Sequence, residues 1–152
     1  MRWRGRDDDR GQVGGIEALP FGLLIFVVGA LVVANAWAVI DAKMAVTSAA
    51  REAARTYVES PSAATAYSDA RAAAREAIDN YHRDANKLTL PPPSGTFERC
   101  EKITFEASYP IPAITLPWIG GFGSGIVVHA RHTEIIDPFR NGVPGSNAPC
   151  FR

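Results

Sequence analysis

Four residues in the C-terminal half of the chain have side chains that suit a metal: Cys100, Cys150, His129 and His132. Thiolate and imidazole are ligands that zinc favours. The two histidines, however, are three residues apart in a segment with strand character. An odd spacing in a strand points side chains to opposite faces. Solvated histidines are therefore the simpler interpretation, and the sequence predicts no metal and no other cofactor.

A disulfide explains Cys100 and Cys150 better than a metal site does. Both cysteines follow the apolar segment of residues 18–40, and a widely separated pair suits an oxidising compartment. Closing a loop of this size would stabilise the fold by about 4 kcal/mol in the chain-entropy model. The alternative is a pair of buried thiols, which suits the cytoplasm.

Glu17 is a lone carboxylate between the glycine-rich stretch "GQVGG" and the apolar segment. Its simplest role is a favourable interaction with the positive end of a helix that starts there. If the segment packs beside other helices in a bilayer, the carboxylate instead needs a positive partner. An amine freed by cleavage just upstream would supply that partner.

The apolar segment "ALPFGLLIFVVGALVVANAWAVI" has no charged residue between Ala18 and Ile40. As a helix it would be about 34 Å long, enough to cross a hydrocarbon core of about 30 Å. We therefore expect a transmembrane helix, with Trp37 as an interfacial anchor. A buried helix of a soluble protein is one alternative. A cleaved secretory signal is another, since four arginines precede the segment and "ANAWA" (34–38) offers a small-x-small pattern.

The orientation follows from basic residues and cysteines. Four arginines precede the apolar segment, and Lys43, Arg51 and Arg55 follow it. This bias is weak on its own, but it agrees with the cysteines in placing the N-terminus in the cytoplasm and the C-terminal part outside.

Helical patterning continues past the apolar segment. Pro20 and Gly22 are expected to bend or loosen the helix near its start, and from Asp41 the pattern runs without glycine or proline to about Glu59. Small apolar residues recur every three or four positions and predict one buried face: Ala42, Val46, Ala49, Ala53 and Tyr57.

A second helix is expected after Ser60 and Pro61, which suit the N-cap and the first helical position. Its apolar stripe would be Ala66, Ala70, Ala74, Ala77, Ile78, Tyr81 and Ala85. After "PPPSG" (91–95) the composition changes, and "KITFEASY" (102–109) alternates apolar and polar residues like a half-buried strand.

The stretch "GIVVHARHTEII" (125–136) predicts a second strand. The loop between the two strands is long, rich in Pro and Gly, and carries Trp118 and Phe122, which suit either the core or a contact with a partner or bilayer. The chain has 16 basic and 16 acidic residues, so no charge excess points to nucleic acid. The sequence also lacks a phosphate-binding glycine loop, HExxH, CxxC and a nucleophile elbow, and we expect no enzymatic activity.

Five features follow one another between about Arg10 and Arg140: "RGQVGGIEALPFGLLIFVVGALVVANAW", "SAAREAAR", "ASYPIPA", the glycine-rich loop and "VVHARHTEIIDPFR". In this order they resemble the TadE-like family of minor pseudopilins from bacterial tight-adherence (Flp-type) pilus systems. In type IV pilins a prepilin peptidase cuts after a glycine on the cytoplasmic side, and a glutamate follows. The resemblance implies that Glu17 is that glutamate and Gly11 the candidate glycine. The family pattern puts the glutamate fifth after the cut, whereas Glu17 is sixth after Gly11, so processing stays open.

The sequence thus predicts an α+β protein with a long N-terminal transmembrane helix that continues outside the membrane, a second helix and a small antiparallel β-sheet. Residues 1–16 would form a cytoplasmic tail, residues 17–40 the span and residues 41–152 an extracytoplasmic α+β domain.

The resemblance implies a single-pass cell-membrane protein that takes part in pilus assembly. Its partners would be the membrane, other pilin-like subunits, the assembly machinery and, if the chain is cut, prepilin peptidase. Neither nucleic acid nor a small-molecule substrate is expected. The alternative is a secreted or membrane-anchored extracytoplasmic binding domain with no pilus role.

Overall fold

The computed structural model describes residues 13–112, 114–116, 119–123, 125–146 and 150. The chain divides into two units, residues 1–37 and residues 38–152. The first unit contributes the N-terminal part of helix α1. The second contains the rest of α1 and the other helices and strands of the described residues.

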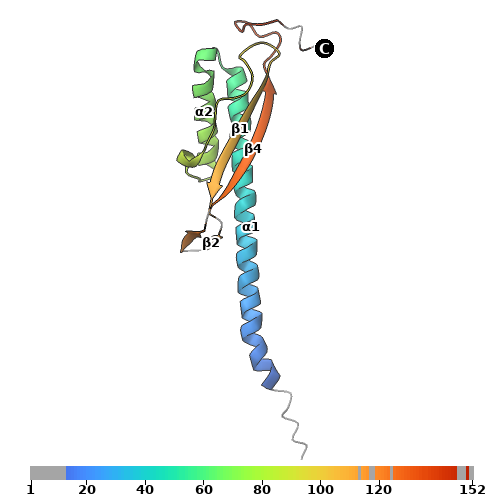
Figure 1. Ribbon diagram of the computed structural model, residues 1–152, viewed down its shortest axis with the longest axis vertical. Coiled ribbons are helices and arrows are strands. Elements are labelled where there is room, and N and C mark those ends of the chain that lie inside the picture. The colour runs from blue at the N-terminus through green and yellow to red at the C-terminus, as the bar shows by residue number, and fades with distance from the viewer. Residues whose placement is uncertain (1–12, 113, 117–118, 124, 147–149, 151–152) are drawn as a thin grey trace, which may run out of the picture. The chain divides into compact units, whose positions relative to one another are not determined.

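Helix α1 (Val13–Glu59) runs without interruption, as the sequence predicted (Figure 1). Pro20 lies inside the helix and does not end it, although its missing N–H removes one backbone hydrogen bond. The helix begins four residues before Glu17, earlier than predicted. Glu17 is therefore outside the first turn, where a carboxylate gains most from the helix dipole.

Helix α2 (Ala63–Asn80) begins later than predicted. Its N-cap is Ser62, whose backbone is extended and whose side-chain oxygen accepts a hydrogen bond from the N–H of Thr65 at 3.4 Å. The prediction that Ser60 caps the helix and that Pro61 is its first residue was therefore wrong. Ser60 is buried instead, and its hydroxyl lies 3.2 Å from Thr65 Oγ1. This contact ties the turn between the helices to the start of α2.

The second helix also ends earlier than the predicted Ala85. After Asn80 the chain turns, and His82 adopts a left-handed backbone with φ of 56°. A short 3-10 helix, η2 (Ala85–Lys87), follows, and the Asp84 side chain caps it by accepting from the Asn86 N–H at 3.0 Å.

The long strands β1 (Lys102–Ile111) and β4 (Ile126–Ile135) form the predicted antiparallel pair. Apolar residues of β1 are buried at every second position, as the alternation predicted: Ile103, Phe105, Ala107 and Tyr109. The other edge of β1 is bridged to the preceding segment at Thr89 and Ser94. The fold class is therefore α+β, with a small antiparallel sheet.

The predicted loop between the long strands contains a short hairpin that the sequence did not indicate. Its strands are β2 (Ile114–Leu116) and β3 (Gly120–Phe122). Gly120 has a φ of 114°, a conformation that glycine adopts without strain.

One core joins the helices to the sheet. All five residues predicted to form the inner face of α1 are buried, and alanine dominates the buried face of α2. Tyr81 and Ala85, which were predicted for the stripe of α2, lie beyond its end and are partly buried. Such small residues let helices pack closely. Aromatic rings fill the space toward the sheet: Tyr57 meets Phe97 and Phe105 edge-on, each at 5.5 Å between ring centroids.

The C-terminal end of α1 is capped from a distant part of the chain. Arg140 donates hydrogen bonds to the carbonyl oxygens of Val58, Glu59 and Ser60, with Nη2 2.6 Å from the Glu59 oxygen. The last turn of α1 has no basic residue of its own. Arg140 therefore supplies both the donors and the positive charge that a helix C-terminus favours.

The expected disulfide between Cys100 and Cys150 is present, with the two Cα atoms 5.2 Å apart. Backbone hydrogen bonds hold the neighbouring chain, since the Arg99 N–H donates to the Pro144 oxygen at 2.9 Å and the Cys100 N–H to the Ile136 oxygen at 3.0 Å. The tail is thus tied back to the start of β1.

Candidate functional site

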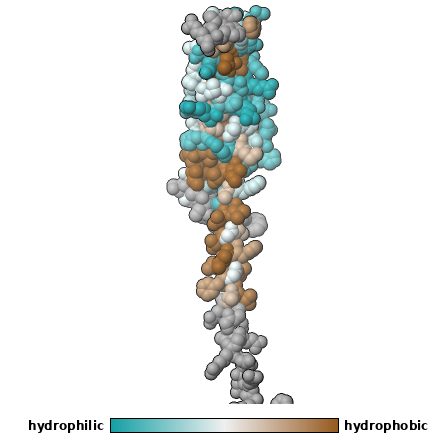
Figure 2. All heavy atoms as spheres, turned by 90° about the vertical axis from the view of Figure 1, so that its right-hand side faces the viewer, coloured by the Kyte–Doolittle hydropathy of each residue, from teal (hydrophilic) through white to brown (hydrophobic). Residues whose placement is uncertain are grey.

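The N-terminal part of α1 has an apolar surface that nothing in its own unit covers. None of the residues in its most apolar stretch of 18 is buried. Large apolar side chains are exposed along it, among them Phe21, Phe26 and Trp37, which is 70 % exposed. Figure 2 shows this surface in brown. The helix is long and apolar enough to cross a membrane.

Asn35 is the one polar side chain in the apolar run of residues 18–40. Its amide nitrogen donates to the Leu31 carbonyl oxygen one turn earlier, at 2.8 Å. Because the helix itself accepts this hydrogen bond, the amide is less costly to place in an apolar environment.

A shallow groove runs along one side of this part of α1. Small residues form its floor and larger side chains its rim: Gly29, Ala30 and Ala34, with Ile25, Phe26, Val33 and Trp37. A Cβ added at Gly29 would meet nothing within 4 Å. Small residues in an exposed apolar helix allow the backbone of a second helix to approach closely.

In the second unit, an ion pair neutralises the first charge after the apolar run. Arg83 Nη2 lies 2.6 Å from Asp41 Oδ2 and 3.3 Å from the Ala38 carbonyl oxygen. The guanidinium also lies over the Tyr109 ring, 5.9 Å from its centroid. Burial raises the pKa of Tyr109, and the positive charge of Arg83 opposes that rise.

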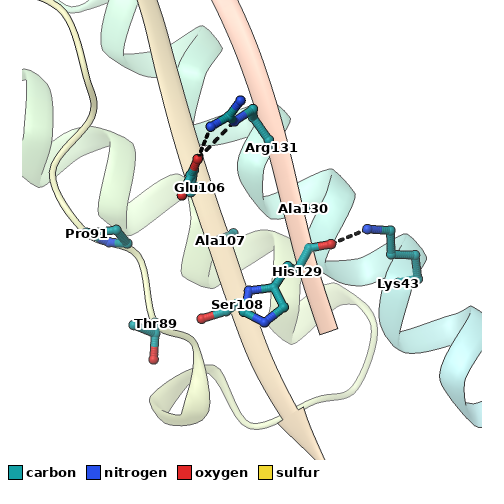
Figure 3. A pocket seen from close by; sticks show the side chains of 9 residues that line it. All are labelled: Lys43, Thr89, Pro91, Glu106, Ala107, Ser108, His129, Ala130 and Arg131. Atoms are coloured by element: carbon teal, nitrogen blue, oxygen red, sulfur yellow. Dashed lines mark hydrogen bonds and ion pairs between the residues drawn. The ribbon is translucent and has the colours of Figure 1, made fainter. Parts of the chain in front are cut away.

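A recess of about 430 Å³ lies where α1 meets the sheet, shown in Figure 3. Lys43 on α1 donates to the carbonyl oxygen of His129 on β4. Arg131 pairs with Glu106 across the two strands, with Nε 2.9 Å from Oε1. The charged groups of the recess therefore already have partners within the chain, and the His129 ring and the hydroxyls of Ser108 and Thr89 add further polar atoms to its wall.

No protein-family model, no curated protein and no solved structure matches this chain.

The structure describes the two candidate processing residues to different extents. Gly11 lies outside the described residues. Glu17 lies within α1, but its side chain is outside the described part of the structure. Of the two aromatic residues noted in the long loop, Trp118 also lies outside the described residues, and Phe122 belongs to β3 with its side chain undescribed.

The histidines and cysteines lie in different environments. His129 pairs with Ser108 on the exposed face of the sheet, whereas His132 pairs with Phe105 on the opposite face. His132 Nε2 lies 2.9 Å from Glu134 Oε1. Both cysteines are in the disulfide. Among the residues that the structure describes, no group of three His, Cys, Asp or Glu side chains is arranged to hold a metal ion.

Two arginines with structural importance were not singled out from the sequence. Arg83 and Arg140 each join segments far apart in the chain, to Asp41 and to the end of α1. Arg83 is part of no motif noted above, and Arg140 is only the last residue of "VVHARHTEIIDPFR". The only sequence signal for Arg140 is that the last turn of α1 lacks a basic residue.

Proposed function

We propose that this protein is a membrane-anchored, pseudopilin-like component that takes part in assembly of a tight-adherence surface pilus and has no enzymatic activity. The observation that carries the proposal is the exposed apolar part of α1, which continues as one helix into a part with an alanine-rich buried face. Such a helix suits a subunit of an assembly. Its exposed N-terminal part is free to contact lipid or other subunits, and its C-terminal part packs into the folded unit. The sequence resemblance to the TadE-like family supports the same proposal.

The proposed location is the cell membrane, crossed once, with the N-terminus in the cytoplasm and residues 41–152 outside. Four arginines before the apolar segment favour this orientation. The disulfide between Cys100 and Cys150 supports it too, because such bonds persist in oxidising compartments.

In this proposal two features of α1 contact other subunits. The groove floored by Gly29, Ala30 and Ala34 accepts a neighbouring helix. Glu17 is neutralised by a cationic group, either the amine of a neighbouring subunit or a group of the assembly machinery. If prepilin peptidase cuts the chain after Gly11, the new N-terminus is such an amine.

The deciding experiment is deletion of the gene and complementation in cells that make these pili. Cells that lack the protein should lose surface pili, seen by electron microscopy, and the full-length chain should restore them. Mass spectrometry of the mature protein separates the intact, prepilin-cut and signal-cut forms. Normal piliation in the deletion strain would contradict the pilus role.

A binding domain without a pilus role is the second candidate, and the recess of Figure 3 favours it. This candidate predicts that deletion leaves piliation unchanged. It also predicts that Arg131→Ala, which opens the recess, alters the retention of an extracellular ligand.

A further inference from the structure

One end of the second unit exposes apolar side chains from three segments. Val39, Ile40 and Met44 belong to α1, Ile126 and Val127 begin β4, and Ile119 lies in the β2–β3 hairpin. Their exposed fractions run from 37 % for Val39 to 71 % for Ile119. We call these six residues the base patch. In Figure 2 a brown band crosses the unit where its teal surface ends.

Three contacts fix how β4 runs beside α1. Arg83 contacts both Asp41 on α1 and Tyr109 on β1, and Tyr109 pairs with Val128 on β4. Lys43 on α1 donates to the carbonyl oxygen of His129 on β4. Farther along, Tyr57 packs on Phe105, which pairs with His132. Residue numbers rise together on both elements, so β4 runs parallel to α1, as Figure 1 shows.

The start of β4 therefore lies level with the start of this unit's part of α1. Ile126 is two residues before Val128, which is about 7 Å along a strand. Ile40 and Val39 are one and two residues before Asp41, within about 3 Å of it along the helix axis. They are the last residues of the uncharged run that begins at Ala18.

Near the base patch the charge of Asp41 is neutralised by Arg83, and the Lys43 ammonium, which donates to the His129 carbonyl oxygen, is a cationic group beside the patch. Away from this end, the exposed face of the sheet becomes polar: Ser108, His129, Glu106, Arg131, Thr104 and Thr133. An apolar end beside a polar body, joined to a membrane-length helix, fits the boundary between acyl chains and headgroups.

We propose that the base patch inserts into the interfacial layer of the bilayer, so that the folded unit rests on the membrane and the start of β4 touches lipid. This inference rests on the proposed membrane anchor and adds a second contact with the same bilayer. Its consequence is that the orientation of the sheet relative to the membrane is fixed by contact and not only by the helix.

The test places a nitroxide label at Val127→Cys in the full-length, disulfide-bonded protein in phosphatidylcholine liposomes. Ile135→Cys is the matched control, because it lies on the same strand, is 50 % exposed against 49 % for Val127, and is at the other end. Val28→Cys, in the apolar run, reports on the anchor itself. Collisions with oxygen, which concentrates in lipid, and with a water-soluble nickel chelate are measured by electron paramagnetic resonance.

We expect the Val127 label to collide several-fold more with oxygen than with the chelate, relative to the Ile135 label. If Val28 reports lipid and Val127 reports water, the anchor stands and this inference fails. If Val28 also reports water, the anchor fails and the inference with it. Shielding of Val127 from both reagents would mean that protein covers the base patch, which also overturns the inference. Ile126→Cys repeats the measurement if the Val127 variant does not fold.

Discussion

Arg83 Nη2 lies 2.6 Å from Asp41 Oδ2, so a residue 42 positions later neutralises the first charge after the apolar run. The Arg83 side chain is 19 % exposed and the Asp41 side chain 42 %. The pair joins α1 to the turn after α2, and the guanidinium's contact with Tyr109 adds β1.

Asp41→Asn should lower the free energy of unfolding by about 1–3 kcal/mol, because it leaves a largely buried guanidinium without its carboxylate. Glu59→Gln is the matched control, since Arg55 and Glu59 form a pair whose side chains are both 63 % exposed. It should change stability by no more than about 0.5 kcal/mol. Denaturant unfolding of the full-length protein in detergent, followed by near-ultraviolet circular dichroism, measures both. Equal losses would contradict a special role for the Arg83 pair.

Arg140→Gln should destabilise the second unit by about 1–3 kcal/mol, because the carbonyl oxygens at the end of α1 lose a charged donor. Arg131→Gln removes an arginine whose side chain is 70 % exposed and should have a much smaller effect. Hydrogen exchange followed by mass spectrometry should show faster exchange in the last turn of α1 in the Arg140 variant alone. Unchanged exchange there would mean that the cap adds nothing.

In an alkaline titration, the buried tyrosines of the folded protein should lose their protons at a higher pH than the tyrosines of the unfolded protein. Burial raises the pKa of Tyr57 and of Tyr109, so the folded state favours the neutral phenols. Their contribution to stability is fully present below the ordinary pKa of about 10 and is lost as pH rises through the folded pKa. When phenolate absorbance of the folded protein is followed against pH, part of the increase should occur at higher pH than in the denatured protein. Tyr109→Phe should reduce this part. A single transition, identical in folded and denatured protein, would rule this out.

Glu17→Gln should insert normally and yet reduce or abolish surface pili. A carboxylate near the end of a span costs far less than the 2.5–3.5 kcal/mol or so at its centre, so insertion barely depends on it. Breaking a buried ion pair from one side typically costs about 3–5 kcal/mol, enough to prevent assembly. Glu17→Asp keeps the charge and is the control. Membrane immunoblots beside electron microscopy of the same cells give the result, and full piliation of the Gln variant would leave Glu17 without an assembly role.

Gly29→Leu should weaken association with other pilin-like subunits, because it fills the groove on α1. Gly22→Leu is the control: neither glycine would contact anything within 4 Å through an added Cβ, but only Gly29 lines the groove. Both variants should reach the membrane at wild-type levels. Co-purification with other subunits should fall for Gly29→Leu alone, and equal recovery would exclude the groove as a helix-packing surface.

Elements with a regular pattern of apolar residues could be predicted from the sequence. The alanine spacing of α1 and α2 and the alternation in β1 placed the core residues correctly, because burial on one face imposes those periods. The N-cap of α2 was misplaced by two residues, since Ser60 and Ser62 are equally suitable locally. Burial of Ser60 within the fold decides between them.

Apart from the disulfide and the pairing of the two long strands, contacts between distant segments could not be predicted. The β2–β3 hairpin consists of three-residue strands among glycines, too short for an alternation to appear. The links from Arg83 to Asp41 and from Arg140 to α1 depend on how the chain folds back, which no local pattern records. Glu17 was singled out as a lone carboxylate before the apolar segment, whereas Gly11 as the candidate cleavage position came from the family resemblance.

The cap and the disulfide also set an order of events during synthesis. Arg140 and Cys150 leave the ribosome after α1, α2 and both long strands, so the end of α1 stays uncapped and Cys100 keeps a free thiol until then. A nascent chain halted before residue 140 would carry a free Cys100 thiol and lack the Arg140 cap at the end of α1. A free Cys100 thiol therefore distinguishes every chain that still lacks Cys150 from the folded, disulfide-bonded unit.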